Sequence, residues 1–319
     1  MALIKYLFEK EKKPRKGLLA VEWVIMGYLL LTTIIILFTY TKAINPESML
    51  WGRFRIAIMT LALWGVYRMM PCRFTHFCRL GAQLALLSWW YPDTFEINRI
   101  FPNLDPAFAS YEQQLFGCQP SLLFSQVVSS PLFSELMIMG YAAYYPLIAV
   151  VALFYFFRRY EDFDRMVFIT LTGFFIYYVI FIALPVTGPQ YYFLAAGVDN
   201  ISQGVFPDVG DYFSTHMEAM PLPGDPDLFF HKLMTAAHTT GERPTAAFPS
   251  SHVGMTIILL ILSWQARNKV LVGLSLVLLI LMNFATIYIR AHYVIDVFGG
   301  WVSAIVIYAV LHFFAKKFV

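Results

Sequence analysis

The sequence predicts an all-α membrane protein, a polytopic helical bundle of about eight transmembrane helices with an ordered extracytoplasmic cap. Hydrophobic residues make up 59% of the 319 residues, whereas charged residues make up only 13%. An ordinary soluble domain is about 25% charged, so this chain has too few charged side chains for a fully water-facing surface. The net charge of +3 and the 18% of aromatic residues exclude nucleic acid as a partner and a disordered chain.

Eight apolar stretches resemble membrane spans, for which roughly 17 to 25 residues are needed. They cover residues 19–41, 54–70, 79–91, 132–157, 166–184, 251–265, 270–289 and 294–314. Residues 79–91 and 251–265 are short for a span, but Trp89, Trp90 and Trp264 are suitable interfacial anchors. The first stretch is longer than a signal-peptide core and lacks an evident cleavage site, so we expect it to remain as a membrane helix.

Lys and Arg residues divide unequally between the two sides of this bundle. With the N-terminus in the cytoplasm, 16 of the 23 Lys and Arg residues fall on the cytoplasmic side. The positive-inside rule therefore predicts that both termini are cytoplasmic. This places an integral membrane protein in a bacterial inner membrane, or facing a Golgi-type lumen in a eukaryote.

The spans divide the chain into four regions. Residues 1–18 are a basic cytoplasmic tail, and residues 19–184 hold the N-terminal transmembrane helices. Within the latter, the prolines and aromatics of 92–131 predict one or two short helices at the outer interface. The long polar and aromatic segment 185–250 predicts an ordered extracytoplasmic cap, and residues 251–319 form the C-terminal transmembrane helices.

The first chemical motif is Phe248-Pro249-Ser250-Ser251-His252, at the outer start of the span 251–265. Ser250 or Ser251 can cap the helix that follows. The unpaired N–H groups at such a helix start attract anions. We therefore expect His252 to lie within an anion site.

The second motif, Arg290-Ala291-His292-Tyr293-Val294-Ile295-Asp296, precedes and enters the last span. His292 and Asp296 are four residues apart and would share one face of a helix. The carboxylate can then accept the Nδ1–H and leave the Nε2 lone pair of His292 for nucleophilic attack. The alternating spans bring this motif to the same membrane face as His252.

These two motifs resemble the second and third signatures of the type 2 phosphatidic acid phosphatase superfamily, over roughly the C-terminal third of the chain. The resemblance implies a helical membrane core, no metal requirement and a phosphohistidine intermediate. It implies that His292 is the nucleophile, Asp296 its orienting partner and His252 the general acid. The catalytic set is therefore expected to be His292, His252 and Asp296, without a cofactor.

The phosphatase pattern is incomplete in this sequence. Ala285 and Thr286 stand where Ser-Arg would precede the nucleophile, and Ala236 stands where Lys would precede Arg243-Pro244. Loss of these phosphate-binding residues is similar to the transferase branch, which includes inositol phosphorylceramide synthases. Residues 184–192 resemble the proline-containing loop of that branch.

The resulting hypothesis is a membrane phosphotransferase that acts on the non-cytoplasmic face. By resemblance, it moves a phosphoinositol-type headgroup from a phosphatidylinositol-like donor to a ceramide-like acceptor. The expected substrate-binding residues are Arg243, Arg290, Ser250, Ser251, Gln190, Tyr191 and Lys232. The oligomeric state is not indicated by the sequence.

Several other interpretations use the same residues. A lipid phosphatase would share the catalytic set and admit water in the second step. A lipid transporter or binding protein would not need the histidines. Two histidines and an aspartate can also form a facial triad for iron, or can simply meet water and backbone groups at helix ends.

Overall fold

The computed structural model describes residues 2–319, except for the side chains at positions 2, 239 and 240. These residues form helices and no β-strand, with one isolated bridge between Lys10 and Cys72. The helices are α1 (Ala2–Leu7), α2 (Ala20–Phe38), α3 (Pro46–Met69), α4 (Arg73–Ala85), α5 (Leu87–Asn98), α6 (Asp105–Phe116), α7 (Pro120–Val127), α8 (Pro131–Ala142), α9 (Tyr144–Arg158), η1 (Tyr160–Asp162), α10 (Phe163–Ala183), α11 (Pro189–Ala196), α12 (Val198–Ser202), η2 (Tyr212–Ser214), α13 (Phe229–Thr240), α14 (Ser251–Gln265), α15 (Lys269–Tyr288) and α16 (Val294–Phe318).

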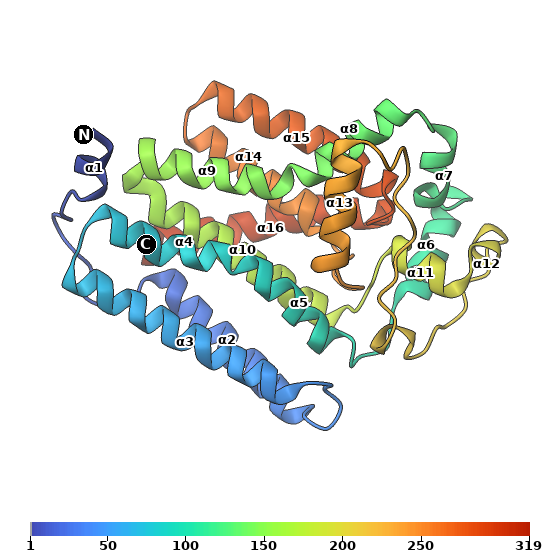
Figure 1. Cartoon of the computed structure of the whole chain (residues 1–319), viewed down its shortest axis with the longest axis horizontal. Coiled ribbons are helices and arrows are strands. Elements are labelled where there is room, and N and C mark those ends of the chain that lie inside the picture. The colour runs from blue at the N-terminus through green and yellow to red at the C-terminus, as the bar shows by residue number, and fades with distance from the viewer. Residues whose placement is uncertain (1) are drawn as a thin grey trace.

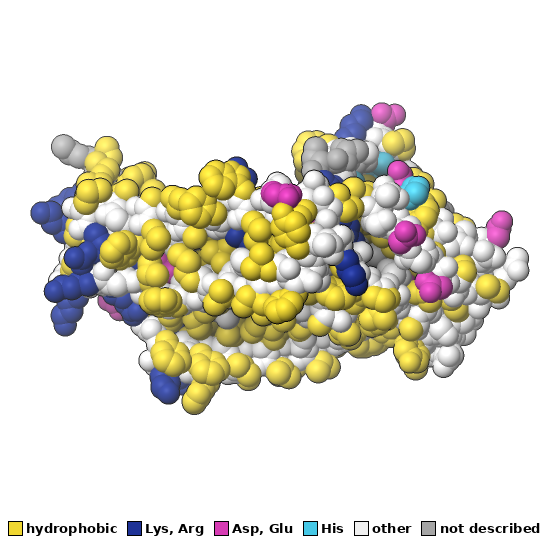
Figure 2. Space-filling model, turned by 90° about the horizontal axis from the view of Figure 1, so that it is seen from below, with side chains coloured by type: hydrophobic (Ala, Val, Ile, Leu, Met, Phe, Trp, Pro, Cys, Tyr) yellow, Lys and Arg dark blue, Asp and Glu magenta, His cyan; other side chains and the backbone are white. Residues whose placement is uncertain are grey.

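The long helices lie side by side and give the molecule two distinct ends (Figure 1). Both termini lie at one end, and α6, α7, α11 and α12 lie at the other. On the face drawn in Figure 2, hydrophobic side chains cover the middle, and the largest group of Lys and Arg side chains lies at the end with the termini. An apolar middle between polar ends is typical of a helical membrane protein.

Five helical segments are long and apolar enough to cross a membrane, namely α2, α3, α15, α16 and the segment Tyr160–Ala183 that includes α10. The helices α8 and α9 would make a sixth as one span that bends by 44°. The helix α14 is apolar but has only 15 residues. The structure thus supports a helical membrane protein with five or six spans by these criteria, below the eight expected from the sequence.

The stretch 79–91 lies across α4 and α5, which are separated at Leu86. Each of these helices carries a buried ionic side chain paired with the N-terminal hairpin of α2 and α3. Arg79 of α4 binds Glu22, and Asp93 of α5 binds Arg53 through two hydrogen bonds of 2.6 and 2.8 Å. These ion pairs attach the hairpin to the rest of the bundle.

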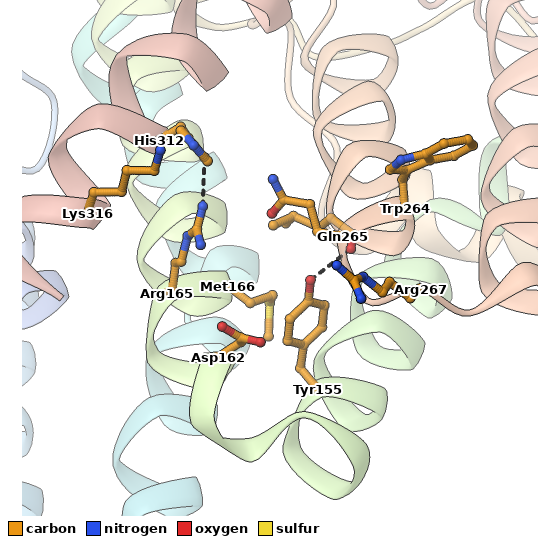
Figure 3. A pocket seen from close by; sticks show the side chains of 10 residues that line it. Tyr155, Asp162, Arg165, Met166, Trp264, Gln265, Arg267, His312 and Lys316 are labelled. Carbon is orange, nitrogen blue, oxygen red and sulfur yellow. Dashed lines mark hydrogen bonds between the residues drawn. The ribbon is translucent and has the colours of Figure 1, made fainter.

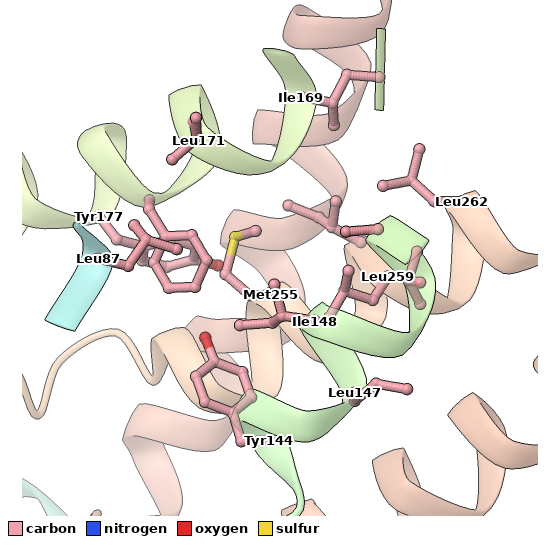
Figure 4. Close-up of a cluster of buried hydrophobic side chains, with 14 of the residues drawn as sticks. Leu87, Tyr144, Leu147, Ile148, Ile169, Leu171, Tyr177, Met255, Leu259 and Leu262 are labelled. Carbon is pink, nitrogen blue, oxygen red and sulfur yellow. The ribbon is translucent and has the colours of Figure 1, made fainter. Parts of the chain in front are cut away.

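The centre of the bundle is α10. In the apolar part of the segment Tyr160–Ala183, which includes α10, 78% of the residues are buried. Figure 4 shows Leu171 and Tyr177 of α10 near Met255 of α14 and Tyr144 of α9, within one cluster of buried hydrophobic side chains. Burial of such apolar side chains stabilises the arrangement of these helices. The helix that carries His252 is therefore held firmly by the core.

The helices α14 and α16 approach closely at two glycines. A Cβ atom on Gly300 would lie 2.7 Å from the carbonyl oxygen of Ser250, and one on Gly254 would lie 3.1 Å from that of Gly300. Small residues permit such close helix packing in membranes. The Ser250 N–H also donates to the carbonyl of Asp296 at 2.9 Å. The starts of the two motif-bearing helices are thus joined.

The segments predicted as interfacial and cap regions are folded. Residues 92–131 contain the end of α5 and the helices α6 and α7, while residues 185–250 contain α11, α12, η2 and α13. The N–H groups of Phe230 and His231 donate to Glu135 of α8, at 2.6 and 3.2 Å. This carboxylate caps α13 and fixes it against the bundle.

Candidate active site

His252 and His292 meet at the joined starts of α14 and α16. The Nε2 atom of His292 lies 3.4 Å from Nδ1 of His252, and the two ring centroids are 5.6 Å apart. His252 stacks on Tyr141 with centroids 4.5 Å apart, and Tyr144 contacts its ring at the same separation. Packing therefore fixes the direction in which His252 faces His292.

The other nitrogen of His292 binds a backbone carbonyl. Nδ1 lies 2.8 Å from the Ala247 oxygen, which can only accept, so Nδ1 carries the proton. In the neutral ring, Nε2 then carries an unprotonated lone pair that faces Nδ1 of His252. This tautomer is the one that a nucleophilic histidine needs.

Asp296 lies near His292 but has a different principal partner. Its Oδ2 atom is 3.5 Å from Nδ1 of His292 and accepts the Tyr293 N–H at 2.8 Å. The expected geometry assumed that both residues lie on one helix, whereas α16 begins at Val294, after His292. The carbonyl of Ala247 therefore takes the hydrogen-bonding position expected for Asp296, and the carboxylate acts on His292 from a longer distance.

His292 lies between the membrane helices α15 and α16 and is only 2% exposed. Burial lowers the pKa of its imidazole from 6.5 to about 4, against the opposing influences of the Ala247 carbonyl and the Glu242 carboxylate. His292 is therefore neutral at physiological pH, which keeps its lone pair available.

A cavity of about 370 Å³ opens beside His252, which lines it, whereas His292 lies behind His252 and is not part of the lining. It lies among α5, α8, α9, α10, α13 and α14, and its lining includes His252, Ser251, Glu242 and five tyrosines, Tyr91, Tyr141, Tyr144, Tyr145 and Tyr178. None of the described residues that line it is Lys or Arg. The cavity therefore offers aromatic faces, hydroxyl groups and one carboxylate.

Four of the predicted binding residues lie close to this site. Ser250 caps α14 by accepting the Val253 N–H at 3.4 Å, and Ser251 lines the cavity. Gln190 approaches the cavity carboxylate, with Nε2 3.4 Å from Oε2 of Glu242. Tyr191 is also buried, and burial together with Glu242 raises the pKa of its hydroxyl well above its usual value.

The three predicted cationic residues lie elsewhere. Arg243 lines a separate cavity with Asp93 and Glu96. Arg290 has a positive φ of 65°, and its guanidinium donates to Ser125 and to the Pro221 carbonyl. Lys232 is exposed and pairs with Asp227 at 3.1 Å. The structure does not bring these three side chains into the cavity beside His252.

Asp105 is a structural residue of the site that the sequence interpretation missed. This fully buried carboxylate accepts hydrogen bonds from the Thr187 N–H at 2.6 Å, the Gly188 N–H at 2.9 Å and the Tyr293 hydroxyl at 3.0 Å. It therefore joins the loop before α11 to the residue that follows His292. Its place just before Pro106 at a helix start was the available signal in the sequence.

Two glutamates were also missed. Glu112 is fully buried and accepts the Val294 N–H at 3.1 Å, so it binds the start of α16, and burial raises its pKa to about 8. Glu242 lines the cavity and lies 3.2 Å from Nε2 of His238. Neither glutamate has a motif spacing to the histidines, so only the fold identifies them.

No group of three or more His, Cys, Asp or Glu side chains suited to a metal occurs among the described residues. The expected lack of a metal requirement stays a prediction.

Thr286, at the Arg position of the phosphatase pattern, donates its hydroxyl to the Met282 carbonyl at 2.9 Å within its own helix.

Comparison with known families supports the C-terminal motifs. A family model described as the PAP2 superfamily matches residues 106–310, which include α6 without its first residue, all of α7 to α15 and most of α16. No curated protein and no solved structure matches the chain. The matched region contains both histidines, Asp296 and the residues that line the cavity from α8 onward.

Proposed function

This chain belongs to the PAP2 superfamily, and from that premise we propose that it is a membrane lipid phosphotransferase with a phosphohistidine intermediate. The proposed reaction moves a phosphoinositol-type headgroup from a glycerophospholipid to a ceramide-type acceptor. The observation that carries the proposal is the histidine pair, in which the unprotonated Nε2 of His292 lies 3.4 Å from His252 beside a cavity.

The reaction takes place in two steps. The Nε2 atom of His292 attacks phosphorus, the bond from phosphorus to the diacylglycerol oxygen breaks, and His252 gives that oxygen a proton. His252 then accepts the proton of the acceptor hydroxyl as its oxygen attacks phosphorus. The phosphorus–nitrogen bond breaks, which restores His292.

The composition of the cavity favours a phosphodiester over a phosphate monoester. A monoester carries close to two negative charges and is usually bound by Arg or Lys, which the described lining lacks. A phosphodiester has one negative charge, for which the N–H groups at the start of α14 are a suitable site. The Glu242 carboxylate can accept hydrogen bonds from inositol hydroxyls, while it would repel a dianion.

The proposal includes the membrane arrangement expected from the sequence. In it, α4–α5, α8–α9 and α14 cross together with the five long spans, which gives eight crossings and two cytoplasmic termini. The helices between residues 185 and 250 then form an extracytoplasmic cap over the site. The Lys and Arg side chains near the termini support this orientation.

The test uses the purified full chain in detergent with headgroup-labelled phosphatidylinositol, with and without ceramide. We expect label to move to a new lipid only when ceramide is present, and we expect this activity to survive EDTA. The His292→Ala variant should give no labelled lipid. The matched control is His216→Ala, at an exposed histidine two residues after η2, and it should retain transfer.

Two outcomes would favour the rival functions. Rapid release of phosphate from phosphatidic acid, with no ceramide product from phosphatidylinositol, would favour a lipid phosphatase built on the same residues. Lipid binding that is unchanged in His292→Ala, with no turnover of any lipid by the parent chain, would favour a transporter or binding protein.

A further inference from the structure

A second cavity, of about 420 Å³, lies at the opposite end of α14 from His252. Its lining includes Gln265, the last residue of that helix. Thirteen positions separate His252 from Gln265, which corresponds to about 20 Å along a helix. The two cavities are therefore separate, and the second has no part in the histidine chemistry.

Basic side chains from three parts of the chain line this second cavity (Figure 3). Arg165 comes from α10, Arg267 follows α14, and Lys316 lies near the end of α16, whereas Asp162 is the one acidic residue in the described lining. None of the three cations forms an ion pair among the described residues. The cavity therefore has three basic side chains against one carboxylate, an excess of positive charge.

The hydrogen bonds around the cavity leave donors available. Arg165 donates from Nη2 to Nδ1 of His312 at 2.7 Å, so His312 is the acceptor and carries its proton on Nε2. The Nε atom of Arg165 has no hydrogen-bond partner among the described residues. Arg165 and His312 thus both retain N–H groups beyond the bond that joins them (Figure 3).

Two backbone carbonyls at the end of α14 have side-chain partners already. The Tyr155 hydroxyl donates to the Leu262 carbonyl at 2.7 Å, and Arg159 donates to the Ala266 carbonyl at 3.1 Å. The negative end of a helix dipole would otherwise attract the nearby cations. Because other side chains bind these carbonyls, Arg165, Arg267 and Lys316 remain available to an external anion.

The cavity is bordered by residue types that are common in the headgroup region of a bilayer. The 15 residues of α14 extend for about 22 Å, less than the hydrocarbon thickness of about 30 Å. The neighbouring α16 has 25 residues and extends past this helix end with Lys316. Trp264, which lines the cavity and is 70% exposed, is a residue type that favours the membrane interface.

We propose that this cavity binds the phosphate-bearing headgroup of an anionic membrane phospholipid in the leaflet opposite the histidine pair. The headgroup phosphate accepts charge-assisted hydrogen bonds from Arg267, Lys316 and Arg165. Its acyl chains lie along the apolar surface of α16, where Val306, Val310 and Phe313 are exposed. This site is independent of the reaction proposed above.

The experiment places the full chain in phosphatidylcholine nanodiscs that contain a minority of phosphatidylserine with a photoreactive diazirine in its headgroup. After illumination, peptide mass spectrometry locates the cross-link. We expect labelling near Trp264 and Lys316, and we expect the double variant Arg267→Gln with Lys316→Gln to lower its yield about tenfold or more.

The matched control removes two exposed cations from the same end, Arg158→Gln with Lys269→Gln, neither of which lines the cavity. It should leave the labelling near Trp264 unchanged. Equal loss in both double variants, or labelling confined to the His252 cavity, would overturn the proposal. Displacement by inorganic phosphate but not by excess unlabelled phosphatidylglycerol would identify a free-anion site instead of a lipid site.

Discussion

His292 makes contacts through both of its ring nitrogens. The Ala247 carbonyl fixes the proton on Nδ1, while Nε2 faces His252. Oδ2 of Asp296 lies 3.5 Å from Nδ1 of His292, and it also caps the start of α16 by accepting the Tyr293 N–H. Its removal therefore affects both the orientation of His292 and the local fold.

The first prediction ranks substitutions at these residues. His292→Ala should reduce headgroup transfer below detection, and His252→Ala should lower kcat by about 10²- to 10⁴-fold, the usual contribution of a general acid or base. Asp296→Asn should have a smaller effect, because the Ala247 carbonyl still holds the tautomer. Lipid transfer assays on each variant, matched for detergent-extracted yield, measure this order. Transfer at the wild-type rate in the His292→Ala variant would exclude His292 as the nucleophile.

The second prediction concerns protonation. Burial lowers the pKa of His292 from 6.5 to about 4, so the unfolded chain binds this proton at higher pH than the folded chain. The free energy of unfolding therefore decreases through His292 as the pH falls from 6.5 toward 4. Below pH 4 this loss stays constant, because both states are protonated. NMR of ¹⁵N-histidine-labelled protein, with His292→Gln for assignment, should find the imidazole neutral at pH 6. A midpoint near 6.5 would contradict the buried geometry.

At the scale of helices, buried ion pairs connect the N-terminal hairpin to the bundle. Arg53 of α3 and Asp93 of α5 are 3% and 5% exposed, and Thr32 of α2 accepts a further bond from Arg53 at 3.0 Å. Removing one member of such a pair leaves a buried charge without a partner, which is far more costly than replacing both.

The third prediction follows from this asymmetry. Arg53→Met alone should lower the free energy of unfolding by about 3 to 5 kcal/mol, whereas Arg53→Met combined with Asp93→Leu should restore most of it. Thermal unfolding of the purified variants in one detergent measures both. A double variant no more stable than the single variant would mean that the pair is not the principal link between α3 and α5.

The helices were predictable because long apolar runs in this chain have few alternatives to helical structure within a membrane. The encounter of His252 with His292 was predictable from alternating spans. The loop position of His292 was not, since a spacing of four residues fits both a helix face and a helix start. Asp105 and Glu112 were missed because the partners that join them to the site lie far away in the sequence, and Glu242 was missed because it has no motif spacing to His252 or His292. The structure does not bring Arg243 and Arg290 into the cavity beside His252, and their part in substrate binding stays a prediction.

At the scale of the whole molecule, the two ends differ in charge and in chemistry. The histidine pair lies at the start of α14 and the basic cavity at its end, so one short helix connects the two sites. The termini lie at one end and α11 and α12 at the other (Figure 1). This polarity makes the membrane orientation testable without reference to activity.

The fourth prediction is that both termini are cytoplasmic and the segment around α12 is not. In a chain whose three cysteines, Cys72, Cys78 and Cys118, are replaced, Asp199→Cys should react with a membrane-impermeant maleimide in cells or vesicles with the outer face exposed. Lys12→Cys should react only after permeabilisation. The reverse pattern would place the histidine pair on the cytoplasmic side.

The most direct test of the central claim is capture of the covalent intermediate. The full chain is mixed with phosphatidylinositol that carries ³²P in its headgroup, without an acceptor lipid, and is quenched in alkali because phosphohistidine is labile in acid. We predict label on the peptide that contains His292, its absence in His292→Ala, and its loss on addition of ceramide as a new labelled lipid forms. Turnover of the lipid with no labelled protein at any time, or label that persists in His292→Ala, would contradict the account.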